Sequence, residues 1–423
     1  MSRTLTRMKR AASLSLGAFL FVAAWGCGGA DAPSQASSGA GGTGGILTGA
    51  DASSSSGATG SHAATTVGVG AGGAGGSAPS CPAVGPFDGD KLIAQPKQWT
   101  WIDVPGAKCR DGSKTGFGVR LNPASDKVYI YLEGGGACFN GTTCAISLGA
   151  FDSKAFGAWA GSVGQLGIFD PNPAVNPVRD WNAVYVPYCT GDVHVGTVSG
   201  QTVPGGPSAQ EFVGYENINL YLKRLIPTFH DASQVMLTGV SAGGFGAAFN
   251  YDRVASAFCP TPVVLLDDSG PPMADPYLAP CLQKQWRALW DIDKTLPPTC
   301  AGCTEANGGG IVNYASYLSA RWPDSRMGLI SSTHDSVIST FFGFGHDTCG
   351  TPQPLTGAEF EAGLVDLRDS YLATTGHWGT YYVDSITHTY LIGPGFYTTQ
   401  VGNKPLTSWV KELLAGQTSN ISP

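Results

Sequence analysis

The sequence predicts an α/β protein whose mainly parallel β-sheet is covered by helices on both faces. Short apolar runs bounded by Gly, Pro or Asp recur along the chain, as expected of buried strands. They span residues 128–132, 183–186, 234–237, 263–266 and 327–330. Helical stretches lie among them, at residues 210–225, 244–257, 359–373 and 406–415. Alternating strands and helices favour a parallel sheet, in which functional sites form at the carboxyl ends of the strands.

The first 26 residues predict a signal for export. A basic region runs through Arg10, and the apolar run that follows at residues 11–24 is short for a membrane span. It ends in Ala24-Trp25-Gly26-Cys27, which resembles a bacterial lipobox. We therefore expect removal of residues 1–26 and a lipid on Cys27 that anchors the exported protein in a membrane at the cell envelope or surface. Ordinary cleavage nearby, which would release a secreted protein, is the alternative.

Residues 27–80 predict a disordered tether. From residue 28 to residue 80 the chain is almost all Gly, Ala, Ser and Thr, with no aromatic residue, Lys or Arg. Such a stretch cannot bury enough apolar surface to fold. From Cys81 onward the composition becomes mixed and aromatic-rich without an internal repeat, so residues 81–423 predict one folded domain. We expect this domain to be monomeric.

The charge of the chain argues against a nucleic-acid partner. The formal net charge is −7, and without Arg3, Arg7, Lys9 and Arg10 of the export signal 20 basic residues face 31 acidic ones, which makes −11. Such a surface repels polyanions. A neutral or acylated substrate fits it better.

The number of cysteines is consistent with lipidation and export. Of the eleven, Cys27 would carry the lipid, which leaves ten, enough for five disulfides in an oxidising compartment. Only Cys138 and Cys144, which lie close together around a tight Gly-rich loop, predict a particular pair. The motif at residues 300–303 suggests redox or zinc chemistry, but no second CxxC or neighbouring His completes a site. We therefore expect a structural disulfide there and no metal.

Ser241 is the predicted nucleophile. An apolar strand leads into the turn Gly239-Val240-Ser241-Ala242-Gly243, and a helix follows it. In an α/β-hydrolase-like fold this G-x-S-x-G turn holds the serine in a strained corner, where the glycines prevent collision between strand and helix. The start of the helix supplies N–H groups near a developing oxyanion, the first from Ala242. The alternative is an ordinary serine in a Gly-rich turn.

A second glycine-rich loop follows an earlier strand, in Leu132-Glu133-Gly134-Gly135-Gly136-Ala137-Cys138. Glycines that leave a strand end can direct their N–H groups toward one point, which the second half of an oxyanion hole requires. The loop matches neither a phosphate-binding nor a dinucleotide-binding pattern. Glu133 is a candidate acid, although a structural role in holding the loop is favoured.

A serine nucleophile needs a base and an orienting acid, which in this fold follow it in the order serine, acid, histidine. The acids near strand ends are Asp267, Asp268, Asp335 and Asp347, and the histidines after Ser241 are His334, His346, His377 and His388. Asp335 is favoured because it follows a late strand within a loop. The Asp-Ser-Gly context of Asp267 and Asp268 indicates loop structure, one strand too early. For the base, His388 and His377 are nearly equal on sequence alone.

Several motifs together point to a known family. A Leu-Glu-Gly-Gly loop with a nearby Cys, a Pro-Tyr-Cys strand end, a Ser-Ala-Gly-Gly turn and an Asp-Ser-Gly turn stand at residues 132–138, 181–192, 241–244 and 268–270, after an early Cys-Arg-Asp-Gly-Ser segment at 109–113. With these motifs, residues 99–390 resemble the pectin acetylesterase and Notum carboxylesterase family, as a bacterial member. The resemblance implies Ser241 as nucleophile, Asp335 as acid, His388 as base, and oxyanion donors from Gly135, Gly136 and Ala242. It implies no metal or organic cofactor.

Two departures from the family pattern limit what the resemblance implies. Gly136-Ala137 stands where relatives often carry Trp or Tyr before the Cys, and Ser385 stands where a Cys often precedes the catalytic His. The first change alters the wall of the acyl pocket, so fatty-acyl specificity as in Notum does not transfer. The run Phe341-Phe342-Gly343-Phe344 suits an acyl pocket and core packing equally well.

These observations predict a serine carboxylic-ester hydrolase that removes O-acetyl groups from a polysaccharide through an acyl-serine intermediate. Its expected partner is an acylated carbohydrate or another ester substrate. The alternatives are a general carboxylesterase or lipid-acyl hydrolase, and a surface binding protein without turnover.

Overall fold

The computed structural model describes residues 81–423. The predicted export signal at residues 1–26, the lipid site Cys27 and the tether lie outside the described residues and stay predictions. Among residues 81–423, no helix is both long and apolar enough to cross a membrane.

Nine strands form the central sheet. They are β1 (Trp99–Lys108), β2 (Lys114–Arg120), β3 (Lys127–Leu132), β4 (Asn182–Val186), β7 (Gln234–Val240), β8 (Val263–Asp268), β9 (Met327–Ser332), β10 (Trp378–Val383) and β13 (Asn420–Ile421). Their order across the sheet is β1-β2-β4-β3-β7-β8-β9-β10-β13. β2 is antiparallel to β1 and β4, and all other neighbours are parallel. Two small antiparallel pairs join β5 (Val198–Gln201) to β6 (Gln210–Phe212) and β11 (Gln400–Val401) to β12 (Lys404–Pro405).

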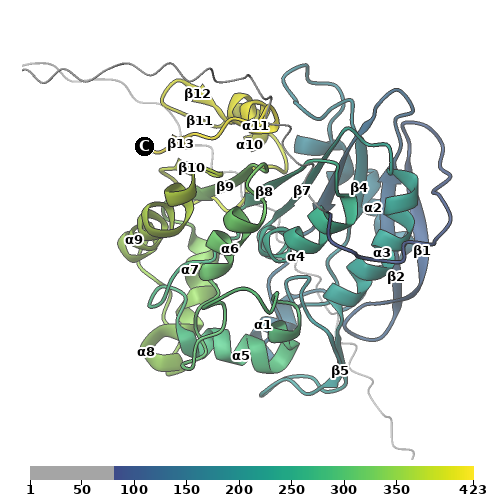
Figure 1. Cartoon of the computed structure of the whole chain (residues 1–423). Helices are drawn as coiled ribbons and strands as arrows, with labels where there is room; N and C mark the ends of the chain where they lie inside the picture. The colour runs from purple at the N-terminus through teal and green to yellow at the C-terminus, as the bar shows by residue number, and fades with distance from the viewer. Residues whose placement is uncertain (1–80) are drawn as a thin grey trace, which may run out of the picture. The chain divides into compact units, whose positions relative to one another are not determined.

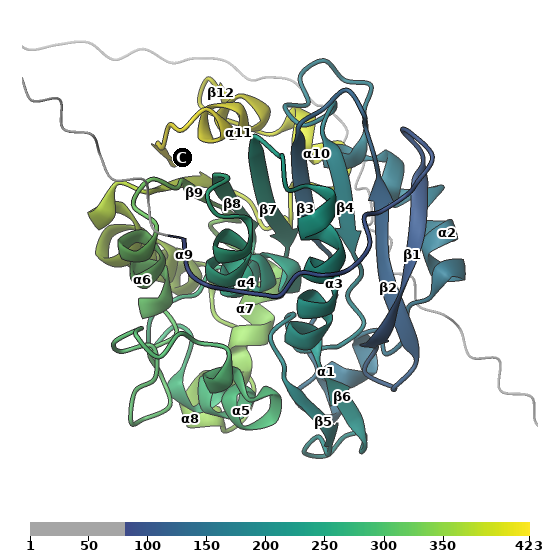
Figure 2. The same ribbon diagram turned by 45° about the vertical axis from the view of Figure 1, so that its right-hand side comes forward.

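Helices connect these strands (Figure 1). They are α1 (Gly141–Ile146), α2 (Ser153–Ala160), α3 (Gly214–Thr228), α4 (Ala242–Phe258), α5 (Pro280–Trp290), α6 (Asn313–Arg321), α7 (Ser336–Phe342), α8 (His346–Cys349), α9 (Gly357–Asp366), α10 (Gly395–Thr398) and α11 (Leu406–Leu414). In Figure 2, α3 and α4 lie in front of the strands, and α1, α5, α7 and α8 lie below them. Because α7 directly follows β9, this lower side is the carboxyl edge of the parallel strands.

The two faces of the sheet carry separate apolar cores, because successive side chains of a strand point to opposite faces. In β3, Val128 and Ile130 belong to one core, and Tyr129 and Tyr131 belong to the other. Residues of α3 and α4 complete the first core, and residues of α2 and α11 complete the second. A parallel sheet buried on both faces accounts for the continuous apolar runs of the sequence.

The predicted fold class is confirmed, with one helix prediction wrong at its start. All five predicted strands occur, as β3, β4, β7, β8 and β9. Residues 210–212 of the predicted helix at 210–225 instead form β6, because Phe212 pairs with Val198 of β5. The helix begins at Gly214, whose N–H donates to the buried carboxylate of Asp192 at 2.8 Å. The pairing of β6 with β5 and the hydrogen bond from Gly214 to Asp192 both join distant segments, so the local sequence pattern does not predict them.

The end of the predicted helix at 359–373 also differs. The α-helical part ends at Asp366, and the chain continues in a π-helical turn over Leu367–Leu372. The other two helix predictions correspond to α4 and α11.

Five disulfides join the ten cysteines of the described residues. They link Cys81 to Cys259, Cys109 to Cys189, Cys138 to Cys144, Cys281 to Cys349 and Cys300 to Cys303. Such a framework is typical of proteins that fold in an oxidising compartment.

Candidate active site

Ser241 occupies the sharp turn between β7 and α4. Its φ is +57°, a left-handed conformation that costs energy in a residue with a side chain and that marks functional turns. A Cβ on Gly239 would collide with the backbone of Gly243, and a Cβ on Gly243 would collide with the carbonyl oxygen of Leu132. The two glycines therefore let the strand and the helix approach closely enough to present the serine.

Residues 134–136, which we call the glycine loop, follow β3 and lie against this turn. A Cβ on Gly134 would collide with the carbonyl oxygen of Val240 and would come within 2.9 Å of the Ser241 Cβ. Gly135 and Gly136 have φ values of +152° and +80°, which residues with side chains rarely adopt. The loop therefore needs glycine both for its own conformation and for its closeness to Ser241.

Three backbone N–H groups of this region are available to a ligand. Those of Gly135, Gly136 and Ala242 donate to no backbone oxygen of residues 81–423. Ala242 is the first residue of α4, where N–H groups lack intrahelical partners and the helix dipole is positive. The three predicted oxyanion donors are thus unoccupied by the fold itself.

Asp335 and His388 form a hydrogen-bonded pair beyond the carboxyl end of β9. Asp335 is buried and caps α7, with Oδ1 accepting the N–H groups of Val337 and Ile338 at 2.9 and 3.0 Å. Its Oδ2 lies 2.7 Å from His388 Nδ1. Because an ionised carboxylate only accepts, Nδ1 carries the proton, and Nε2 of the neutral ring is an acceptor. This Nε2 is buried and has no partner among the described residues, so its lone pair is free. It is therefore not hydrogen-bonded to Ser241 Oγ in this structure, and the two groups must approach each other for proton transfer.

Asp268 connects the serine turn to the loop that carries His388. It ends β8 and is fully buried. Its carbonyl oxygen accepts the Ser241 N–H at 2.8 Å, and its Oδ2 accepts the N–H groups of Tyr390 and Leu391 at 2.6 and 2.8 Å. Burial raises the pKa of this carboxyl to about 6, against the effect of the hydrogen bonds. The sequence carried a signal, the Asp-Ser-Gly motif, but its interpretation as loop structure missed the side chain's contacts.

A buried polar network holds the glycine loop. Glu133 Oε2 accepts a hydrogen bond from the Tyr185 hydroxyl group, and His194 Nε2 donates to the Glu133 carbonyl oxygen at 2.9 Å. Burial raises the pKa of Glu133 to about 7 and lowers the pKa of His194 to about 4. His194 is therefore neutral near pH 7. Glu133 occupies the structural place that the sequence favours for it, whereas no sequence pattern singled out Tyr185 or His194.

The remaining candidates lie elsewhere. His377 directly precedes β10, and its carbonyl oxygen accepts the N–H of Met327 at the start of β9. It therefore lies at the amino edge of the sheet, opposite the serine turn. The other two histidines are near other acids: His334 near Asp384 and Glu361, and His346 near Asp347. Asp267 accepts the N–H of Gly270, and burial raises its pKa well above the usual range.

A small apolar cavity, which we call the acyl cavity, opens beside Ser241. Its volume is about 30 Å³, far below the roughly 300–1,000 Å³ that is usual for ligand pockets. The bulk of its wall is aromatic or aliphatic, from Val193, Phe245, Phe249, Trp286, Phe341 and Phe342. Gly136 and Ala137 also line it. The phenylalanine run that the sequence left undecided thus contributes both to this wall and to the core.

The described residues hold no group of three or more His, Cys, Asp or Glu side chains placed to bind a metal ion. Cys300 and Cys303, the candidate redox or zinc pair, are joined to each other. Cys138 and Cys144 are joined directly after the glycine loop, around the start of α1.

A family model described as pectinacetylesterase matches residues 96–315, slightly more than half of the chain. The matched segment contains the glycine loop and Ser241 and ends before Asp335 and His388. The placement of the latter two therefore depends on geometry.

Three curated relatives are palmitoleoyl-protein carboxylesterases. Notum2 of Xenopus laevis is 36% identical over 155 residues, which make up 35% of this chain and 30% of that protein. Notum1' of Xenopus laevis is 32% identical over 221 residues, 50% of this chain and 42% of that protein. Human NOTUM is 32% identical over 151 residues, 35% of this chain and 29% of that protein. The chain thus spans less than half the length of these relatives.

The Wnt deacylase Notum from Drosophila has a similar structure. Its TM-score is 0.54 at 21% sequence identity, and the match covers 74% of this chain and 93% of that chain. A likeness at this level of identity shows a shared fold.

Proposed function

The chain belongs to the pectinacetylesterase family, and on that premise we propose that it is an exported serine carboxylic-ester hydrolase that removes O-acetyl groups from a polysaccharide. The family and the Notum carboxylesterases both support a carboxylic-ester hydrolase. The observation that carries the choice of acetyl is the acyl cavity of about 30 Å³ beside Ser241.

The proposed reaction uses Ser241, His388 and Asp335 in sequence. His388 Nε2 takes the Ser241 hydroxyl proton as Oγ attacks the ester carbonyl, and Asp335 stabilises the imidazolium through its 2.7 Å hydrogen bond to Nδ1. The tetrahedral oxyanion receives hydrogen bonds from the N–H groups of Gly135, Gly136 and Ala242. His388 then returns the proton to the departing sugar alcohol, which leaves an acyl-serine. Water, deprotonated by His388, releases the acid and restores the serine.

The size of the acyl cavity supports a short acyl group. An acetyl ester places only a methyl group beyond its carbonyl carbon, which a cavity of about 30 Å³ can hold. A longer chain would have to displace Phe341, Phe342 or their neighbours, and packed interiors resist such overpacking. Phe341 lies close to the glycine loop beside Ala137, since its Cζ would lie 3.2 Å from a Cβ on Gly136.

The second candidate is a general carboxylesterase or lipid-acyl hydrolase. The names of the curated relatives favour it, since they are palmitoleoyl-protein carboxylesterases. The third hypothesis is a surface binding protein without turnover. It has less support, because binding alone requires neither a hydrogen-bonded Asp335–His388 pair nor free N–H groups beside a strained serine.

The proposed setting is outside the cytoplasm. Five disulfides support export. In this proposal residues 1–26 are removed, Cys27 carries a lipid, residues 27–80 form the tether, and residues 81–423 act as a monomeric catalytic domain. Equal recovery of wild type and Cys27→Ala in washed membranes would argue against the lipid anchor.

Hydrolysis of p-nitrophenyl esters and labelling by a fluorophosphonate test the activity. Wild type should cleave the acetyl ester faster than the octanoyl and palmitoyl esters and should be labelled at Ser241, whereas Ser241→Ala should show neither reaction. If a folded wild-type protein is inert in both assays, the esterase proposal is wrong and the binding-protein hypothesis remains. Faster cleavage of the palmitoyl ester would favour the lipid-acyl hydrolase. Acetate release from acetylated pectin, xylan and chitin fragments then identifies the polymer.

A further inference from the structure

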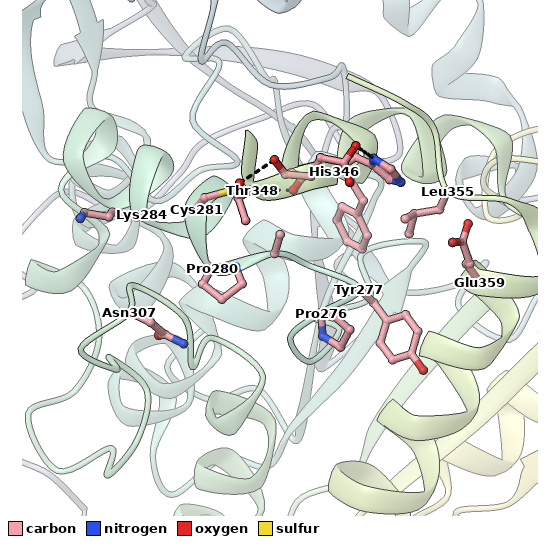
Figure 3. A pocket seen from close by; sticks show the side chains of 14 residues that line it. Pro276, Tyr277, Pro280, Cys281, Lys284, Asn307, His346, Thr348, Leu355 and Glu359 are labelled. Carbon is pink, nitrogen blue, oxygen red and sulfur yellow. Dashed lines mark hydrogen bonds and ion pairs between the residues drawn. The ribbon is translucent and has the colours of Figure 1, made fainter. Parts of the chain in front are cut away.

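A second cavity, which we call the large cavity, lies near the acyl cavity. Its volume is about 640 Å³, within the range of roughly 300–1,000 Å³ that is usual for ligand pockets. Figure 3 shows the side chains along it, including Pro276 and Tyr277 from the segment that leads into α5, Pro280 at the start of α5, and Leu355 from the segment before α9. Its lining surface is mainly apolar, and its titratable side chains are Lys284, His346, Asp347 and Glu359.

Among the described residues, only Phe342 lines both cavities. It is the last residue of α7 and is 2% exposed. Its ring centroid lies 6.3 Å from that of Phe245, which lines the acyl cavity, and 6.4 Å from that of Phe360 in the core. The ring is thus held on both sides. The candidate catalytic acid Asp335 caps the other end of the same helix.

We propose that Phe342 determines the acyl-chain length that the site accepts, and that the large cavity is an apolar extension which its ring closes off. This inference rests on the proposed esterase function. Two observations carry it. The acyl cavity is narrow, with a volume of about 30 Å³, and the space beyond the shared wall has a volume of about 640 Å³ and is mainly apolar. Replacing the ring by a small side chain joins the two spaces, so that a medium-length acyl chain extends from Ser241 into the large cavity.

The chemistry of the large cavity fits this role. An extended acyl chain has no hydrogen-bonding groups, so its transfer from water to an apolar wall is favourable without polar partners. Each additional methylene group that reaches such a wall should improve kcat/KM by roughly fourfold. Lys284, Asp347 and Glu359 at the cavity are exposed to solvent, and the half-buried His346 has its Nδ1 3.2 Å from Asp347 Oδ2.

The test compares p-nitrophenyl acetate, butanoate and octanoate in Phe342→Leu, Phe342→Val and Phe342→Ala. The ratio of kcat/KM for octanoate to that for acetate should rise in this order and should exceed the wild-type ratio by at least about tenfold in Phe342→Ala. Fluorophosphonate labelling of Ser241 shows which variants keep an assembled site. If labelled variants keep the wild-type ratio, or if wild type itself cleaves octanoate as well as acetate, the inference is wrong.

Two further variants show that the gain comes from the large cavity. Phe341→Ala removes a ring that lines the acyl cavity alone and should raise the octanoate ratio far less than Phe342→Ala. Phe342→Ala combined with Leu355→Trp places a bulky side chain in the large cavity and should return the preference to acetate. An undiminished octanoate gain in the double variant would refute the inference. A wild-type protein inert to acetate and to the fluorophosphonate would instead refute the proposed function, so the two failures are distinguishable.

Discussion

The buried carboxylate of Asp268 accepts the backbone N–H of Tyr390 at 2.6 Å. Tyr390 lies two residues after His388, and the carbonyl oxygen of Asp268 also accepts the N–H of Ser241 at 2.8 Å. One residue at the end of β8 therefore holds both the serine turn and the loop of the candidate base. Thr389, between His388 and Tyr390, has a φ of +68°, so the loop adopts a costly conformation that these hydrogen bonds stabilise.

Asp268→Ala should lower kcat by about a hundredfold with little change in KM. The variant leaves two buried N–H groups unpaired and lets His388 move, and a displacement of about 1 Å can cost about a hundredfold in rate. Asp268→Asn keeps an acceptor oxygen and should remain within about tenfold of wild type. Steady-state kinetics measure kcat and KM separately, and thermal unfolding shows whether the variant has lost stability. Equal losses of kcat in both variants would contradict a positioning role through these hydrogen bonds.

Asp335→Asn should lower kcat by about ten-thousandfold while leaving stability nearly unchanged. The amide oxygen can still cap α7 by accepting from Val337 and Ile338, but the amide nitrogen donates to His388 Nδ1 and favours the wrong tautomer. The matched control, Asp335→Ala, loses the cap as well and should also be less stable by about 1 kcal/mol. Kinetics and calorimetry together check the prediction. An active Asn variant would show that Asp335 is not the acid.

Gly136→Ala should lower kcat by about a hundredfold to a thousandfold, because it disturbs a proposed oxyanion donor. The new side chain would sit at a φ of +80° and 3.2 Å from the Phe341 ring. Gly376→Ala is the control, since Gly376 has a φ of +71°, has no atom within 4 Å of its Cβ position, and precedes β10 at the opposite edge of the sheet. Both variants should be strained by roughly 1–3 kcal/mol, but only the first should lose turnover. A similar loss of kcat in Gly136→Ala and Gly376→Ala would show that the loss comes from reduced stability and not from the oxyanion site.

The stability of the fold should depend on the ionisation of Glu133. Burial raises its pKa from 4.5 to about 7, so between these pH values the folded state keeps a proton that the unfolded state releases. The free energy of unfolding therefore falls as pH rises through this window, and the loss is complete above about pH 7.

Glu133→Gln cannot lose this proton, so its stability relative to wild type should rise by up to about 3 kcal/mol from pH 4.5 to pH 7.5. Urea unfolding at a series of pH values measures the difference. Glu305→Gln, whose exposed side chain makes no hydrogen bond or ion pair among the described residues, corrects for the change of net charge. A stability difference that stays constant with pH would count against a buried, protonated Glu133.

The sequence by itself determined the fold class, the central strands and the serine turn. These features depend on local patterns: apolar runs of strand length, and glycines at the two positions where a strand and a helix would otherwise collide. The glycine loop could also be predicted from a local pattern, its run of glycines. A residue with a Cβ cannot adopt the φ of Gly136 without strain.

Only the tertiary structure decided what depends on contacts between distant segments. His377 and His388 were nearly equal on the residues alone, and only the family resemblance favoured His388. The direction of β10 puts His377 at the amino edge of the sheet and His388 beyond the carboxyl edge, 2.7 Å from Asp335. Asp268 contacts the His388 loop across 122 residues of sequence, and Phe342 lies between two cavities because α7 packs beside α4. These hydrogen bonds and cavity linings bring together residues that lie far apart in the sequence, so no local sequence pattern predicts them.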